Sequence, residues 1–205
     1  MNKTNNILKV GKDVLRIAAK NISRNERKLG PSFVKAINTI NNRKGNIIVV
    51  GVGKSGIIAN KFAATLSSTG NLCIFIHPTE AFHGDFGKIS DGDVLIIFSH
   101  SGETKEIIDF LSIFKKRFVN NQIISITSKK NSTVSSMSNI TLLTYVEEEN
   151  PNSDFKLIPT TSTTTTLALS DAIALSLQTL NSSNVAKFYN NHPGGNIGQI
   201  SKTYN

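Results

Sequence analysis

Residues 49–57, VVGVGKSGI, decide how the chain around them folds. The stretch ends an apolar run, NIIVVG (46–51), that is typical of a buried β-strand, and it enters a segment of helical period. Gly51, Gly53 and Gly56 stand between the two, and residues without a side chain suit a tight turn. A strand that turns directly into a helix is the first half of a β-α-β unit, so this stretch predicts an α/β fold.

Four more short apolar runs repeat the strand pattern. They cover residues 72–77, 93–99, 122–127 and 139–144. The runs are nearly continuous rather than alternating, as expected for strands that are covered on both faces. Segments of helical period separate most of them, which gives the order β-α-β-α-β-α-β-α-β. This order predicts a doubly wound, five-stranded parallel sheet flanked by helices, with right-handed crossovers.

The two ends of the chain extend this core. Residues 1–45 are expected to form two helices that are separated at a Gly-Pro pair, because Gly suits a helix end and Pro a helix start. Residues 46–182 are expected to form the α/β core, and residues 183–205 a C-terminal segment that contains NHPGGNIG. The sequence shows no internal repeat and no second domain, so residues 1–205 are expected to form a single domain.

The composition is that of a globular protein, with 39% hydrophobic and 18% charged residues, which excludes a disordered chain. No apolar run approaches the roughly 18 residues needed to span a bilayer, and the N-terminus lacks the apolar core of a signal peptide. The single Cys73 cannot form an internal disulfide. These features predict a soluble, cytoplasmic protein with no membrane partner. The net charge of +9 is scattered, which favours a small anionic substrate over a nucleic-acid partner.

The glycine-rich stretch could belong to several phosphate-binding loops. A Walker A loop needs a glycine where Ile48 stands, so a P-loop nucleotidase is disfavoured. A dinucleotide-binding loop has the right glycines but needs an acidic residue at the end of the second strand. That strand ends at His77, and Glu80 is displaced from the required position, which argues against a dehydrogenase. A sugar-phosphate loop and a plain tight turn remain.

A second polar loop, SHSGET (99–104), follows the third expected strand. It gathers hydroxyls and backbone N–H groups where a helix begins, which favours anion binding. Ligands collect at the carboxyl ends of the strands in an open α/β sheet, so both loops are expected to face one cleft. Plain helix capping is the alternative. The residues expected to bind a sugar phosphate, some through backbone N–H groups, are Ser55, Ser99, His100, Ser101, Gly102 and Thr104.

These segments resemble the sugar isomerase (SIS) family, whose phosphate loop has the form S-x-S-G-E-[ST]. GVGKSG, STGN, HPTEAFHGDFGKISDGDVLIIFSHSGET, PTTSTTTTLALSDAIA and NHPGGNIG resemble the bacterial arabinose 5-phosphate isomerases in order and spacing, over about residues 10–198. The resemblance implies a flavodoxin-like SIS fold and a cytoplasmic homotetramer. It also implies reversible interconversion of D-arabinose 5-phosphate and D-ribulose 5-phosphate through an enediol, with no required cofactor. This phosphosugar would supply Kdo for lipopolysaccharide synthesis. The chain resembles the short form, which lacks regulatory CBS domains.

The resemblance also assigns roles to individual residues. Lys54 matches the active-site lysine of the family, expected to stabilise the enediolate, and a cation is otherwise disfavoured at a helix start. His83 matches an active-site histidine suited to ring opening or proton transfer. His77 matches a position linked with inhibitory zinc and is also expected to contact substrate, with a strand-end hydrogen bond as the alternative. Glu106 matches the catalytic glutamate, and Glu103 does not.

Two further catalytic residues are expected near the C-terminal part of the chain. Counting back three residues from Pro151, as in the E-x-x-P of the family, selects Glu148, although Glu147 and Glu149 remain open. His192 precedes Pro-Gly-Gly, and in the family this segment reaches the active site of a neighbouring subunit. The alternative for His192 is an ordinary surface turn.

Two other functions remain open. Another SIS isomerase would act on a hexulose or heptose phosphate, and the H-P-x-E-A-x-H-G-D and H-P-G-G segments argue against it. A non-catalytic sugar-phosphate sensor, as in transcription regulators with SIS domains, needs a DNA-binding module ahead of the domain. Residues 1–42 are too short for a complete module and continue the core pattern.

Overall fold

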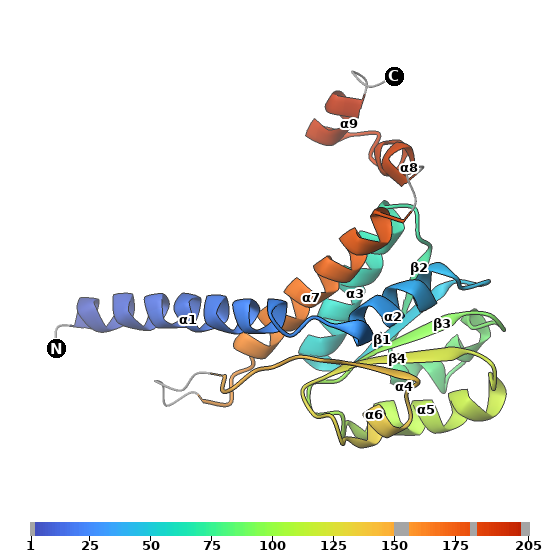
Figure 1. Cartoon of the computed structure of the whole chain (residues 1–205), viewed down its shortest axis with the longest axis horizontal. Coiled ribbons are helices and arrows are strands. Elements are labelled where there is room, and N and C mark those ends of the chain that lie inside the picture. Colours follow the sequence, from blue (N-terminus) through green and yellow to red (C-terminus); the bar gives the residue numbers. More distant parts are fainter. Residues whose placement is uncertain (1–2, 150–155, 181–183, 202–205) are drawn as a thin grey trace.

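The computed structural model describes residues 3–149, 156–180 and 184–201 (Figure 1). Its centre is a five-stranded parallel sheet in the order β2-β1-β3-β4-β5, which confirms the predicted doubly wound, flavodoxin-like sheet. Each strand lies within the apolar run that predicted it. The strands are β1 (Ile47–Gly51), β2 (Cys73–Ile76), β3 (Val94–Phe98), β4 (Gln122–Thr127) and β5 (Ile140–Leu143).

The register brings the ends of the two central strands together. Ile47 pairs with Val94, and Gly51 pairs with Phe98, so β1 and β3 end side by side. The chain crosses from β1 to β2 on one side and from β3 to β4 on the other, which makes the boundary between β1 and β3 the point where strand order reverses. Ligands of open α/β sheets bind outside the carboxyl ends of the strands at such a point.

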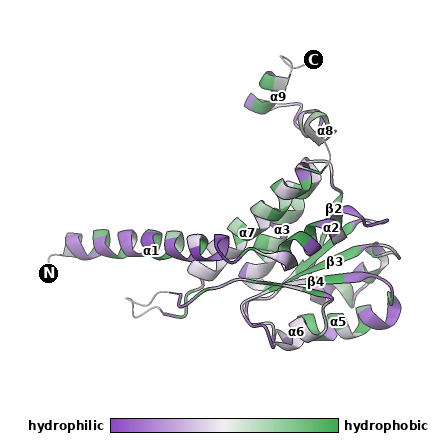
Figure 2. Cartoon of the chain, in the orientation of Figure 1, coloured by the Kyte–Doolittle hydropathy of each residue, from purple (hydrophilic) through white to green (hydrophobic). Residues whose placement is uncertain are grey.

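Both faces of the sheet are covered, which explains the continuous apolar runs. In β1, Ile47 and Val49 belong to one core cluster, whereas Ile48 and Val50 belong to the other. The strands are correspondingly hydrophobic in Figure 2. The covering helices are α2 (Pro31–Asn41), α3 (Gly53–Ser68) and α7 (Thr161–Gln178) on the first face and chiefly α5 (Lys105–Arg117) on the second.

The crossovers are less regular than the predicted alternation. Only α3 and α5 are long helices between successive strands; the segment from β2 to β3 contains the short α4 (Pro78–Ala81) and the 3-10 helix η1 (Asp85–Lys88). The segment from β4 to β5 contains the short α6 (Thr133–Ser136). Gly84 and Gly92 adopt φ angles of +122° and +89°, which interrupt helical geometry between β2 and β3.

The N-terminal residues form the two predicted helices, α1 (Lys3–Glu26) and α2, with proline as the first residue of α2. The last turns of α1 are anchored, because the Asn25 side chain donates to the Tyr145 carbonyl (3.0 Å) and accepts from the Tyr145 N–H (2.8 Å). The preceding turns extend away from the sheet (Figure 1). None of the described helices is long and apolar enough to cross a bilayer.

The C-terminal helices α8 (Asn184–Asn190) and α9 (Gly195–Ser201) lie beyond the end of α7 (Figure 1). They contact the end of α3 and the turn that follows it. The Asn191 side chain donates to the carbonyls of Ser67 and Ser68 in the last turn of α3, at 3.2 Å each, and a Cβ on Gly70 in the following turn would lie 2.6 Å from the Lys187 side chain. This turn leads into the amino end of β2. The C-terminal segment therefore lies at the opposite edge of the sheet from the ends of β1 and β3.

We expect the core under α3 to dominate stability. Phe62 of α3 is fully buried, with its ring centroid 5.7 Å from that of Phe98 in β3. Replacing Phe62 by Ala leaves a cavity, and the free energy of unfolding should fall by about 3–5 kcal/mol. Urea denaturation followed by circular dichroism measures this. Val119→Ala is the control, because Val119 is 77% exposed, and it should change stability by less than about 0.5 kcal/mol. Equal effects of the two variants would contradict the packing.

Candidate functional site

The turn after β1 is built on direct backbone contact. A Cβ on Gly51 would lie 2.9 Å from the backbone nitrogen of Gly56, and a Cβ on Gly56 would lie 2.7 Å from the carbonyl oxygen of Gly51. Gly53 begins α3 with a φ of +58°, which favours glycine. This geometry places Lys54 and Ser55 in the first turn of α3, where Lys54 is exposed and Ser55 is half-buried.

The loop after β3 is held by its own hydroxyls. The Ser99 side chain is buried, accepts the Gly102 N–H (3.1 Å) and lies 3.1 Å from the Thr104 hydroxyl. The Ser101 hydroxyl accepts the Glu103 N–H at 3.2 Å. Gly102 has a φ of +67°, and a Cβ there would lie 2.1 Å from the hydroxyl oxygen of a serine in the turn after β4. Ser99 and Ser101 thus cap N–H groups of their own loop, as in the capping alternative.

The two glutamates after this loop are in different environments. The Glu103 carboxylate accepts the N–H of Thr133 in α6 at 2.9 Å, and this hydrogen bonding lowers the pKa of Glu103. Glu106 is exposed in the first turn of α5, with no hydrogen bond or ion pair to another described residue. Glu106 is therefore the carboxylate that is free to meet a ligand at the start of α5.

His100 connects the loop to the end of β4. Its carbonyl oxygen accepts hydrogen bonds from the Ser128 N–H (2.9 Å), the Ser128 hydroxyl (2.8 Å) and the Thr127 hydroxyl (3.1 Å). Its Nδ1 is buried and has no partner among the described residues. Burial lowers the pKa of the imidazole, while the nearby Glu149 opposes that shift. The imidazole is therefore neutral at physiological pH.

The two histidines after β2 are arranged differently from each other. His77 caps α4, with Nδ1 accepting the Thr79 N–H at 3.3 Å, which is the strand-end hydrogen bond of the alternative interpretation. His83 is exposed after α4. Asp85 pairs with Lys88 at 2.7 Å. Over the described part of the chain, no three His, Cys, Asp or Glu side chains gather in a group that could hold a metal ion.

The three glutamates of the acidic run after β5 differ in the residues they contact. Glu147 forms ion pairs with Lys20 and Arg24 of α1. Glu148, which the pattern selects, is exposed, and the proline from which it was counted lies outside the described residues. The Glu149 carboxylate accepts the N–H groups at the start of α7, and it lies near the His100 imidazole. Its donors are Thr160 (2.9 Å) and Ser162 (3.1 Å).

Glu149 thus lies near His100 of the candidate site, whereas the spacing in the sequence selects Glu148. A carboxylate that caps a helix across a long loop leaves no fixed spacing in the sequence. The one sequence feature that points to such a contact is the hydroxyl-rich start of α7, because the free N–H groups of a helix start need acceptors.

His192 does not join these residues in its own chain. Its Nδ1 lies 2.7 Å from the Phe188 carbonyl oxygen, and its ring packs at a tilt of 41° against that of Phe188, with a centroid separation of 4.3 Å. The segment contacts the C-terminal end of α3, whereas Lys54 lies at the N-terminal end. A helix of 16 residues is about 24 Å long, so the two side chains are at opposite edges of the molecule.

The model of the SIS domain family matches residues 39–176. Arabinose 5-phosphate isomerase KpsF of Escherichia coli is 42% identical over 168 residues, which are 82% of this chain and 51% of KpsF. Arabinose 5-phosphate isomerase KdsD of Francisella tularensis is 40% identical over 190 residues, which are 91% of this chain and 57% of KdsD. The chain thus spans about half the length of the curated relatives it matches. The structure of c3406 from E. coli CFT073 in complex with arabinose 5-phosphate is 36% identical, with a TM-score of 0.82 over 92% of this chain and 97% of that one.

We expect the loop after β3 to be intolerant of any side chain at Gly102. Gly102→Ala combines a left-handed backbone with a clash against Ser132, and it should destabilise the fold by about 2–4 kcal/mol. Urea denaturation measures the change. Gly87→Ala is the matched control, since no atom lies within 4 Å of a Cβ at Gly87, and its effect should be below about 1 kcal/mol. If Gly102→Ala were as stable as the control, the loop geometry described above would be wrong.

Proposed function

The chain belongs to the SIS domain family, and from this premise we propose that it interconverts D-arabinose 5-phosphate and D-ribulose 5-phosphate. The observation that carries the proposal is the adjacency of two loops, after β1 and after β3, with an exposed lysine in the first. The names of KpsF and KdsD, and the arabinose 5-phosphate bound to c3406, support the choice of substrate. Because those curated relatives are longer, the activity itself is part of the proposal.

In this proposal the phosphate binds where α5 begins. The N–H groups of that first turn point out of the helix, and the loop supplies further N–H groups and hydroxyls. Ser55 and Thr104 are half-buried and suited to contact it, whereas Ser99 keeps the loop in shape from inside. Binding the dianion at this edge places the sugar carbons over the turn after β1.

The isomerisation moves a proton between C1 and C2 and shifts electron pairs within the sugar. It therefore needs no external oxidant, reductant or cofactor. The Lys54 ammonium stabilises the oxyanion that develops in the enediolate. Glu106 is the carboxylate free to carry the proton, because Glu103 is held by Thr133. His83 assists ring opening of the cyclic aldose. Glu149, anchored at α7, takes the role that the sequence pattern assigned to its neighbour.

The proposal includes a homotetramer that shares its sites. The described part of α1 carries exposed apolar side chains along a helix that projects from the sheet, and such a face suits a second copy of the chain (Figures 1 and 2). They are Ile7 (65% exposed), Leu8 (56%), Val10 (46%) and Leu15 (73%). His192 lies too far from its own Lys54 to serve it and is free to complete a neighbouring site. The resemblance to the family further supports a cytoplasmic enzyme that supplies Kdo synthesis.

We expect purified protein to convert ribulose 5-phosphate to arabinose 5-phosphate without added nucleotide, as followed by product identification. Lys54→Ala should lower kcat by at least about a hundredfold, because it removes charge stabilisation from the transition state. The matched control is Lys116→Ala, an exposed lysine of α5 away from both loops, which should retain wild-type rates. Binding of arabinose 5-phosphate without turnover would favour a sensor over an enzyme. Normal rates in Lys54→Ala would remove this lysine from the mechanism.

Shared sites predict complementation between inactive variants. Lys54→Ala and His192→Ala should each be inactive alone, but co-expressed subunits should recover about a quarter of wild-type activity if each site takes Lys54 and His192 from different chains. A co-expressed pair of Lys54→Ala and Glu106→Ala should recover none, because both residues come from one chain. Full activity of His192→Ala alone would show that the C-terminal segment takes no part.

A further inference from the structure

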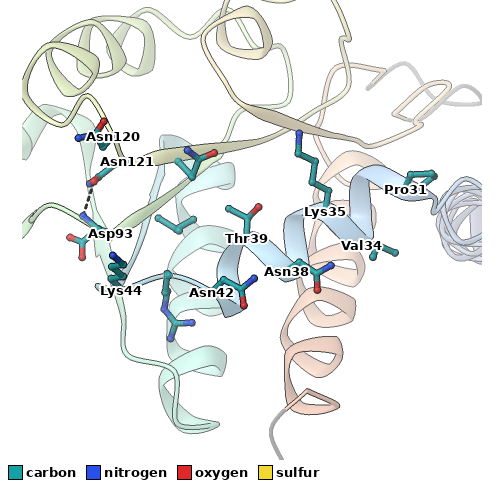
Figure 3. A pocket seen from close by; sticks show the side chains of 14 residues that line it. Pro31, Val34, Lys35, Asn38, Thr39, Asn42, Lys44, Asp93, Asn120 and Asn121 are labelled. Carbon is teal, nitrogen blue, oxygen red and sulfur yellow. Dashed lines mark hydrogen bonds between the residues drawn. The ribbon is translucent and has the colours of Figure 1, made fainter.

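A hollow of about 1010 Å³ lies at the amino edge of the sheet, opposite the candidate site (Figure 3). We call it the amino-edge pocket. Its walls are the outer face of α2, the connection from α2 to β1, and the turns that precede β3 and β4. Its volume is at the upper end of the roughly 300–1,000 Å³ that small-molecule pockets occupy. None of the residues that have a role in the activity proposed above lines this pocket.

The walls of the pocket are fastened to one another by buried polar groups. Asp93 is 1% exposed, and its carboxylate accepts the N–H groups of Asn46 (2.6 Å) and Ser90 (2.8 Å). The buried Asn121 side chain accepts the Gly92 N–H at 2.8 Å (Figure 3). It also donates to the Ser90 carbonyl at 2.8 Å. These bonds join the three connections before β1, β3 and β4. The pocket is therefore formed before any ligand arrives.

A half-buried cation lines this pocket without an anionic partner. The Arg43 guanidinium donates to the Ile40 carbonyl (2.7 Å) and the Asn71 side chain (3.2 Å), while its Nε is buried without a partner. Within the described residues, no carboxylate lies within 4.0 Å of it. Burial lowers the pKa of Arg43 and raises the pKa of the neighbouring Cys73 thiol to about 12, so the thiol supplies no charge. A partly desolvated cation without a counter-charge is unfavourable, and a bound anion would remove that cost.

The other side chains that line the pocket also add positive charge and polar groups. Lys35 and Lys44 are exposed and form no ion pair with any described residue. Asp93 is the acidic residue of the lining, and both of its carboxylate oxygens already accept hydrogen bonds from backbone N–H groups. Asn38 and Asn120 also line the pocket and offer amide donors and acceptors. The pocket thus presents positive charge together with groups that bind hydroxyls.

We propose that the amino-edge pocket binds a phosphorylated, hydroxyl-bearing small molecule of up to nucleotide size, as a second site separate from the loops after β1 and β3. Guanidinium and ammonium groups are the side chains that recognise phosphate oxygens, and side-chain amides recognise hydroxyls and ring nitrogens. The volume exceeds what a pentose phosphate alone needs. A ligand there would bridge α2 to the turn before β4.

The test is calorimetric titration of the full chain with three probes: adenosine 5′-monophosphate, pyrophosphate and inorganic phosphate. We expect saturable binding of at least one probe, and at least about a tenfold weaker Kd in the double variant Lys35→Glu/Lys44→Glu. Both lysines are exposed, so the fold should survive, and circular dichroism would confirm it. Lys54→Ala should bind the probe as the wild type does, because Lys54 lies at the other edge of the sheet.

The control is Lys12→Glu/Lys116→Glu, which makes the same change of net charge on exposed positions of α1 and α5. This variant should keep the wild-type Kd. An equal loss of affinity in the control would reduce the effect to general electrostatics and overturn the proposal. So would the absence of saturable binding by all three probes at millimolar concentration. Loss of binding in Lys54→Ala, with binding retained in the pocket variant, would place the probe at the carboxyl edge instead.

Discussion

The backbone contact between Gly51 and Gly56 is the constraint on which the other features depend. A Cβ on either glycine would lie only 2.7–2.9 Å from a backbone atom of the other glycine, so α3 can leave β1 at its very end only with glycine in both places. The helix then starts at the carboxyl edge of the sheet. Because Gly51 pairs with Phe98, the loop after β3 starts beside it. One close approach thereby sets the position of Lys54 relative to the loop after β3.

The same architecture gives the two edges of the sheet different chemistry. At the carboxyl edge, helix N-termini and small hydroxyl residues create loops that satisfy some of their own N–H groups, as Ser99 does for Gly102. At the amino edge, buried side chains such as Asp93 and Asn121 bind the turns together and leave Arg43 without a counter-charge. The parallel arrangement requires this asymmetry, because every strand has its carboxyl end at one edge and its amino end at the other.

Individual residues show how far local patterns reach. The choice of Glu106 over Glu103 follows motif spacing, and the structure adds the reason that Glu103 is held by α6. In the acidic run after β5, spacing selects Glu148, which is exposed, and the structure adds that the neighbouring Glu149 is anchored at α7. The predicted helix between β2 and β3 was reduced to short turns because Gly84 and Gly92 adopt positive φ angles. Motifs within one turn were predictable, whereas contacts across long loops were not.

The sequence by itself determined where the five strands lie, that they run parallel, and where the two loops after β1 and β3 lie. These features depend on apolar runs and glycine turns, which act over a few residues. Only the tertiary structure decided which carboxylate stands at α7 and which hydroxyls point inward. It also decided that His192 lies at the far end of α3 from Lys54. The position of His192 depends on pairing between segments more than a hundred residues apart, as between Asn191 and Ser67. Glu149 reaches Thr160 and Ser162 across 11 and 13 residues of the chain, and no local pattern records either kind of contact.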